Sequence, residues 1–219
     1  MSALARHPSQ ASPAEDRRVL PADAPGSAGM PDALAALRAA TRDIHAHLDS
    51  ALPLARGDAT LADYTQHLHA LSDWLAALDG AVAGPGAPAA PAGWAQRQQG
   101  RRERIALDLR DCGGLPAAET SGAAANLPPG RPGFGWGVAY VVEGSQLGGT
   151  VLYRRLHERL APHPLRYLRG DGGASPWPAF TAELRRAVAT PAATAAACAG
   201  AVAAFGLLVD GFRRRGVGV

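Results

Sequence analysis

The chain has 219 residues, a formal net charge of +3 and no long run of lysine or arginine. We therefore expect no nucleic-acid partner, because such proteins gather basic residues on one face. The two cysteines form no motif, and the N-terminal residues include no apolar stretch of signal-peptide length. We therefore expect a cytoplasmic protein with reduced cysteines rather than a secreted protein cross-linked by disulfides.

The N-terminal residues 1–31 mix Pro, Ala, Ser and Gly with scattered charge and show no periodicity. This composition predicts a disordered tail. An ordered domain is expected over residues 32–214, with a short C-terminal tail over 215–219. Asp32 is placed to cap the first helix. That helix is indicated by apolar-face positions three or four residues apart, at Leu34, Leu37, Thr41, Ile44 and Leu48.

The rest of the chain also has the periodicity of helices. Segments rich in Pro and Gly over 84–93, 128–135 and 170–178 predict loops between them. No segment alternates with the period of two that a strand requires. Helices are predicted over residues 61–82, 101–110, 117–125, 136–160, 179–188 and 191–214. The sequence thus predicts a single all-α domain of six or seven helices.

The segment 191–209 carries no charge and is long enough to cross a bilayer. Its content of Ala, Thr, Cys and Gly makes transfer into lipid unfavourable for a segment of this length. We interpret it as a buried final helix and expect no membrane insertion.

One candidate metal ligand lies on the first helix. His45 sits beside the apolar stripe, one turn after Thr41. Arg38 lies two turns before it on nearly the same face, about 10 Å along the axis. A neutral imidazole in this position can bind haem iron, and an arginine at that distance can reach a propionate. A helical histidine is, however, more often an ordinary core or surface residue.

A second candidate is a cluster of glycines within an apolar helix, at Gly144, Gly148 and Gly149. Each interior glycine costs about 0.5–1 kcal/mol relative to alanine, so the bare backbone needs a reason. Gly144 and Gly148 share one face and could admit a flat ligand. Close packing of two helices through small residues explains them equally well.

Together the two segments resemble a known family. LRAATRDIH (37–45) is similar to the proximal helix of haem oxygenases, and YVVEGSQLGG (140–149) resembles the distal helix of their bacterial branch. Asp63-Tyr64, residues 104–109 and Phe205 with Phe212 add to the likeness. The resemblance covers about residues 32–214. It implies an all-α bundle that holds haem between the first helix and the glycine-rich helix.

The resemblance also implies roles for individual residues. His45 would be the proximal iron ligand, and Asp49 would set its tautomer. Gly144, Ser145, Gly148 and Gly149 would line the distal side, where the reaction takes place. Contacts to the remainder of haem are expected from Arg38, Thr41, Tyr140, Arg185, Phe205 and Phe212.

The implied activity is cleavage of haem b by O2 and electrons to biliverdin, CO and Fe2+. Because the chain has no flavin or nicotinamide fingerprint, an external ferredoxin or reductase would supply the electrons. Animal members have Asp where this chain has Ser145, so a proton would travel through Ser145, water or a more distant basic group. Thr181 also falls where a Lys is expected near the propionates.

Other functions stay open on the sequence alone. A haem carrier or sensor without turnover would share His45 and the apolar slot. A thiaminase-like hydrolase would need a nucleophilic Cys with acidic neighbours, and Cys198 has none in sequence. A di-iron oxidase would need several inward-facing acids and histidines, which the His67/His69 pair does not supply. A purely structural module leaves the glycines unexplained.

Overall fold

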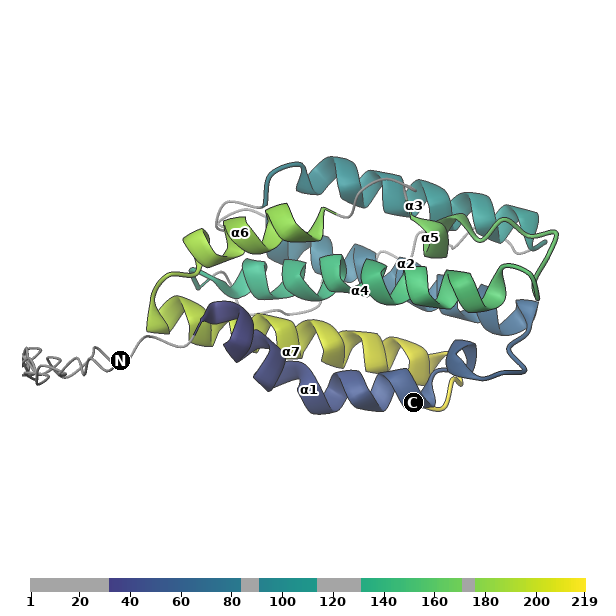
Figure 1. Cartoon of the computed structure of the whole chain (residues 1–219), viewed down its shortest axis with the longest axis horizontal. Coiled ribbons are helices and arrows are strands. Elements are labelled where there is room, and N and C mark those ends of the chain that lie inside the picture. The colour runs from purple at the N-terminus through teal and green to yellow at the C-terminus, as the bar shows by residue number, and fades with distance from the viewer. Residues whose placement is uncertain (1–31, 84–90, 114–130, 171–175) are drawn as a thin grey trace, which may run out of the picture. The chain divides into compact units, whose positions relative to one another are not determined.

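The computed structural model describes residues 32–83, 91–113, 131–170 and 176–219. All regular elements in these ranges are helical, which confirms the all-α class. The predicted tail over 1–31 and the predicted helix over 117–125 lie outside the described residues. The elements are α1 (Ala33–Ala51), the 3-10 turn η1 (Pro53–Ala55), α2 (Leu61–Ala83), α3 (Trp94–Asp111), α4 (Phe134–Leu156), α5 (Arg166–Arg169), α6 (Trp177–Ala187) and α7 (Pro191–Arg214) (Figure 1).

Helix α1 starts and stops where local chemistry dictates. The Asp32 carboxylate accepts a hydrogen bond from the Leu34 amide at 3.4 Å, as the capping prediction requires. Leu52 is extended because it precedes Pro53, and this ends the helix. The buried side chains of α1 include Leu34, Leu37 and Leu48, and its main packing partner is α7.

Helix α7 is the element on which α1, α2 and α4 all pack (Figure 1). Length and composition alone would let it cross a membrane, but half of its apolar window is buried among the other helices. Glycines bring its backbone close to α4: a Cβ added at Gly137 would overlap the Ala197 carbonyl, and one added at Gly200 would overlap that of Phe134. Trp74 of α2 donates to the Ala204 carbonyl at 2.8 Å.

The structure corrects the predicted bounds of three helices. Helix α3 begins seven residues before the predicted start at 101, because Trp94 is buried and anchors a polar first turn. Helix α4 runs from Phe134 rather than 136, and it ends at Leu156 rather than 160. Helix α6 begins at Trp177 with Pro178 in its first turn, where proline is well tolerated, and not at 179.

Helix α5 was not predicted from the sequence, and a buried carboxylate explains its position. Asp108 of α3 accepts hydrogen bonds from the Tyr64 hydroxyl at 2.6 Å and from the Tyr167 amide at 2.9 Å. Its other oxygen lies 3.1 Å from the guanidinium of Arg166. These long-range contacts fix a four-residue helix that has too little periodicity to be recognised in the sequence.

Candidate functional site

A hollow of about 370 Å³ lies along one face of α1, and one residue of α4 also lines it. Its lining residues are Arg38, Thr41, Arg42, His45, Ala46 and Asp49 from α1, and Tyr140 from α4. Five of these seven were predicted site residues. Arg42 was missed, although its spacing from Arg38 and His45 puts it on the same helical face.

His45 is oriented by a carboxylate one turn later. Its Nδ1 lies 2.8 Å from Oδ2 of Asp49, as the predicted tautomer-setting contact requires. The edge of its ring meets the Phe205 ring of α7, with centroids 6.0 Å apart and planes at 74°. The side chain is 60% exposed. With a proton on Nδ1 shared with Asp49, the Nε2 lone pair is available to a ligand.

The rim of the hollow combines a cation with two hydroxyls. Thr41 is buried and donates to the Leu37 carbonyl at 2.8 Å. Burial raises the pKa of Tyr140, while the nearby charge of Arg38 and a hydrogen bond with Thr41 oppose that increase. Tyr140 therefore keeps its proton at neutral pH and can donate a hydrogen bond beside the exposed Arg38.

The three predicted glycines of α4 have different surroundings. A Cβ added at Gly148 would meet nothing within 4 Å, so this face of the helix is open. At Gly144 the added atom would lie 3.6 Å from the Trp177 ring, and at Gly149 it would lie 3.5 Å from the Leu168 carbonyl of α5. Gly149 thus packs against α5, whereas close packing on α7 is the role of Gly137. Close helix packing does not account for Gly148.

Two exposed apolar side chains flank this open backbone. Leu147 is 40% exposed and Val151 is 46% exposed, both on α4. Gly144, Gly148 and Val151 follow the spacing of a single helical face. Leu147 and Val151 were not predicted as site residues, because the sequence of an apolar helix does not show which of its apolar side chains are exposed.

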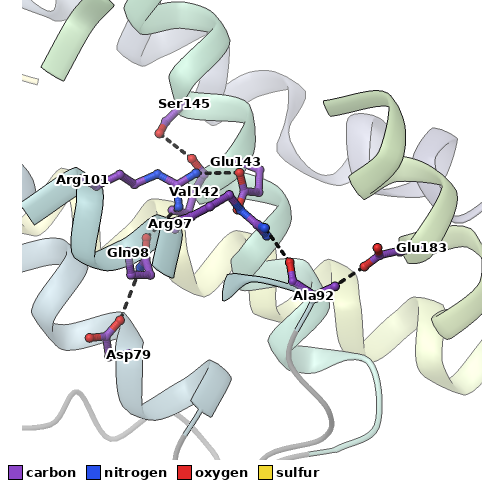
Figure 2. Close-up of polar contacts among 9 residues, drawn as sticks. All are labelled: Asp79, Ala92, Arg97, Gln98, Arg101, Val142, Glu143, Ser145 and Glu183. Carbon is purple, nitrogen blue, oxygen red and sulfur yellow. Dashed lines mark hydrogen bonds and ion pairs between the residues drawn. The ribbon is translucent and has the colours of Figure 1, made fainter. Parts of the chain in front are cut away.

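Ser145 lies beside a polar cluster between α3 and α4 (Figure 2). Its hydroxyl donates to the Val142 carbonyl at 2.8 Å. The phenol of Tyr167 on α5 is adjacent. Burial raises the pKa of Tyr167, while the charge of Arg101 and hydrogen bonding with the Ser145 hydroxyl lower it. Ser145 is therefore joined to a buried phenol rather than directly to solvent.

The cluster is centred on Glu143, which was not a predicted site residue. One carboxylate oxygen lies 2.9 Å from Nε of Arg97, and the other lies 2.6 Å from Arg101 (Figure 2). Arg101 also donates to Gln98 at 2.8 Å. Glu143 is 2% exposed and Arg101 is 3% exposed. Two cations of α3 thus hold α4 at the residue immediately before Gly144.

Two predicted contact residues lie away from the hollow. Arg185 of α6 forms two hydrogen bonds to the carboxylate of Asp32, at 3.0 and 3.3 Å. Phe212 packs on the His67 ring of α2, with centroids 5.3 Å apart. Among the residues that the structure describes, no three His, Cys, Asp or Glu side chains gather as a metal site, which is the arrangement that a di-iron oxidase needs.

Comparisons with known proteins agree on one family. The family model described as "Heme oxygenase" matches residues 32–214. A haem oxygenase of Xanthomonas campestris pv. campestris is 34% identical over 165 residues, which are 73% of this chain and 87% of that protein. The crystal structure of the NO- and CO-bound haem oxygenase of Neisseria meningitidis has a similar fold, with a TM-score of 0.64 and 22% identity over 85% of this chain and 92% of that one.

Proposed function

The chain belongs to the haem oxygenase family, which degrades haem, and on this basis we propose that it cleaves haem b to biliverdin, CO and Fe2+. The domain responsible would be residues 32–214. The observation that carries the proposal is the pairing of His45 with Asp49 in a hollow shared by α1 and α4. O2 and an external electron donor, a ferredoxin or a reductase in the cytoplasm, complete the reaction.

The residues around the hollow suit the chemistry of haem. Its iron needs a neutral imidazole nitrogen, which His45 offers at Nε2. Its propionates need cations, and Arg38 and Arg42 line the same hollow. Its flat apolar ring needs uncovered apolar surface and close backbone approach, which Val151 and Gly148 provide. Each part of the molecule thus has a counterpart on α1 or α4.

On the proximal side, His45 would hold the iron and Asp49 would hold the imidazole. A carboxylate that accepts the Nδ1 proton fixes the ring orientation and increases the basicity of Nε2. When bound, haem supplies the redox and oxygen-binding chemistry, and the protein supplies orientation and protons. Phe205 limits the movement of the His45 ring through its edge-on contact.

At the rim, Arg38 and Tyr140 would bind the propionates. A guanidinium forms a charge-assisted bond to a carboxylate, and the protonated Tyr140 hydroxyl donates a second bond. Thr41 acts on Tyr140 rather than on the ligand. Arg185 would have to exchange Asp32 for a propionate, because its guanidinium forms two hydrogen bonds to that carboxylate.

On the distal side, Gly144, Gly148 and Gly149 would keep α4 narrow, with Gly148 in direct reach of the ligand. Ser145 would deliver the proton. The Ser145 hydroxyl donates to the Val142 carbonyl and can accept from Tyr167, so the buried phenol could replace a proton that Ser145 releases. Phe212 is buried against His67, so it would stabilise the packing of α7 on α2 rather than touch the haem ring.

The experiment that tests binding is an absorption titration of the purified protein with hemin. We expect one haem per chain and the spectrum of an imidazole-ligated iron. His45→Ala should abolish that ligand signature, and added imidazole should restore it. His47→Ala is the matched control, because His47 lies two residues away on the same helix and does not line the hollow. An unchanged spectrum in His45→Ala would refute the assigned ligand.

A further inference from the structure

Gly144 and Gly148 differ in what covers them, although they lie one turn apart on α4. The space beside Gly144 is filled by the six-membered ring of Trp177, with two of its carbons 3.6 Å from an added Cβ. The space beside Gly148 is empty to 4 Å. A flat ligand that approaches the bare backbone of α4 can therefore advance as far as Gly148 and then meets an indole.

Trp177 is held in this position by other aromatic rings. Its centroid lies 5.5 Å from that of Tyr140 and 5.6 Å from that of Phe180. Phe180 is in turn 6.0 Å from Trp136. These four rings connect the core of α4 and α6 to the hollow, because Tyr140 lines it. Such offset and tilted pairs stabilise one another, so the indole forms a firm wall rather than a loose surface group.

We propose that Trp177 is a specificity-determining residue, which stops the haem macrocycle along α4 and so sets which of its edges lies beside Gly148. The inference rests on the proposed function, since it concerns how haem is seated. Arg38 and Tyr140 bind the ring from its propionate side, and the indole limits it at the Gly144 end. Because the indole lies against the Tyr140 ring, a haem whose propionates are held by Arg38 and Tyr140 meets it at the adjacent edge and keeps one orientation about the axis through His45.

Removal of the Trp177 indole should therefore allow haem to bind in more than one orientation. In Trp177→Ala the macrocycle gains space beside Gly144, and a second rotational orientation becomes populated. We expect the population ratio of the two orientations to change about fivefold, because the free energy of an aromatic contact of this kind corresponds to a ratio of that size. Trp177→Phe keeps a ring in place and should stay close to the wild type.

The first readout is proton NMR of the cyanide complex, in which the shifts of the haem methyl groups report orientation without turnover. The second is chromatographic separation of the biliverdin isomers. Trp136→Phe is the matched control, because it loosens the same aromatic cluster without touching Gly144. Circular dichroism and the Tm of each haem-free variant show whether the fold is kept. Trp177→Leu, which removes the ring but keeps more apolar volume, provides the same test if Trp177→Ala does not fold.

A new methyl pattern together with a changed isomer ratio in Trp177→Ala, absent from Trp136→Phe, supports the proposal. Identical methyl patterns in the wild type and in a folded Trp177→Ala overturn it. Equal changes in Trp177→Ala and Trp136→Phe also overturn it, because loosening of the cluster would then be the cause. A wild type that binds haem in one orientation but forms no biliverdin contradicts the proposed function alone, and one that binds no haem contradicts both.

Discussion

At the scale of single residues, the proposed binding of haem iron requires Nε2 of His45, rather than Nδ1, to be the free nitrogen. Asp49 lies 2.8 Å from Nδ1 and can accept its proton, which would leave Nε2 for the iron of the proposed ligand. The contact joins two exposed groups, so its contribution to folding is small. Its importance is to the ligand, because a negative partner strengthens the imidazole as a donor.

Asp49→Asn should therefore weaken haem binding more than it weakens the fold. Loss of such a partner typically costs about 10- to 100-fold in metal affinity. We expect a decrease in this range by hemin titration, with a lower iron–histidine stretching frequency by resonance Raman spectroscopy. Asp43→Asn, on the same helix but outside the hollow, is the control. Equal affinity in both variants would remove Asp49 from the site.

Gly148→Ala should separate ligand binding from stability. The added methyl group points into open space and replaces an exposed glycine inside a helix, so the haem-free protein should gain about 0.5–1 kcal/mol. The same methyl group would obstruct a ring that lies against α4, so hemin affinity should fall. Urea denaturation and hemin titration measure the two effects. A stabilised variant with full affinity would show that the ligand does not reach Gly148.

At the scale of elements, α4 is positioned by charge as well as by packing. The carboxylate of Glu143 is buried between Arg97 and Arg101. Removal of one partner from a buried ion pair leaves the other charge without compensation in a place that water does not reach. The register of α3 against α4 thus depends on one side chain next to the distal glycines.

Glu143→Leu should lower the free energy of unfolding by about 3–5 kcal/mol, because Arg101 would remain buried and charged. Arg185→Ala breaks an ion pair to Asp32 whose two side chains are nearly half exposed, and it should cost less than about 1 kcal/mol. Urea denaturation of both variants, compared with the wild type, measures the difference. Similar losses in the two variants would contradict a structural role for Glu143.

Most elements could be predicted because their signals are local. The Asp32 cap and the apolar periodicity predicted where α1 lies, and the predicted bounds of α7 agree with the structure at both ends. Helix α5 could not be found, since it forms through contacts to Asp108 from residues more than 50 positions away. The start of α3 was missed because burial of Trp94 outweighs a polar first turn.

The same division applies to the candidate site. The face of α1 with Arg38, Thr41, His45 and Asp49 follows from helical spacing, and the structure brings these residues into one hollow. The cover over Gly144 and the pairing of Ser145 with Tyr167 depend on how α5 and α6 fold onto α4. Spacing along one helix carries no information about either contact.

At the scale of the whole molecule, a buried histidine couples stability to pH. His67 lies between α2 and α7 with its ring against Phe212, and burial lowers its pKa from 6.5 to about 4. The unfolded chain takes up this proton below pH 6.5, whereas the folded protein resists it until about pH 4. The contribution of His67 to stability is thus complete above pH 6.5 and is lost as the pH falls towards 4.

His67→Leu should therefore flatten the acid side of the stability curve. The loss attributed to His67 between pH 6.5 and 4 is about 3 kcal/mol, at about 1.4 kcal/mol for each pH unit. Urea denaturation at several pH values, with the wild type and His67→Leu in parallel, measures it. If the two curves run parallel from pH 7 to 4, the coupling does not arise from His67.

Turnover of the haem complex tests the proposed haem oxygenase activity most directly. The purified complex would be supplied under air with ferredoxin, its reductase and NADPH, while the absorption spectrum and CO release are followed. We predict decay of the Soret band, growth of the broad red band of biliverdin and one CO for each haem. A haem complex that stays intact under these conditions would contradict an oxygenase and indicate a carrier or sensor.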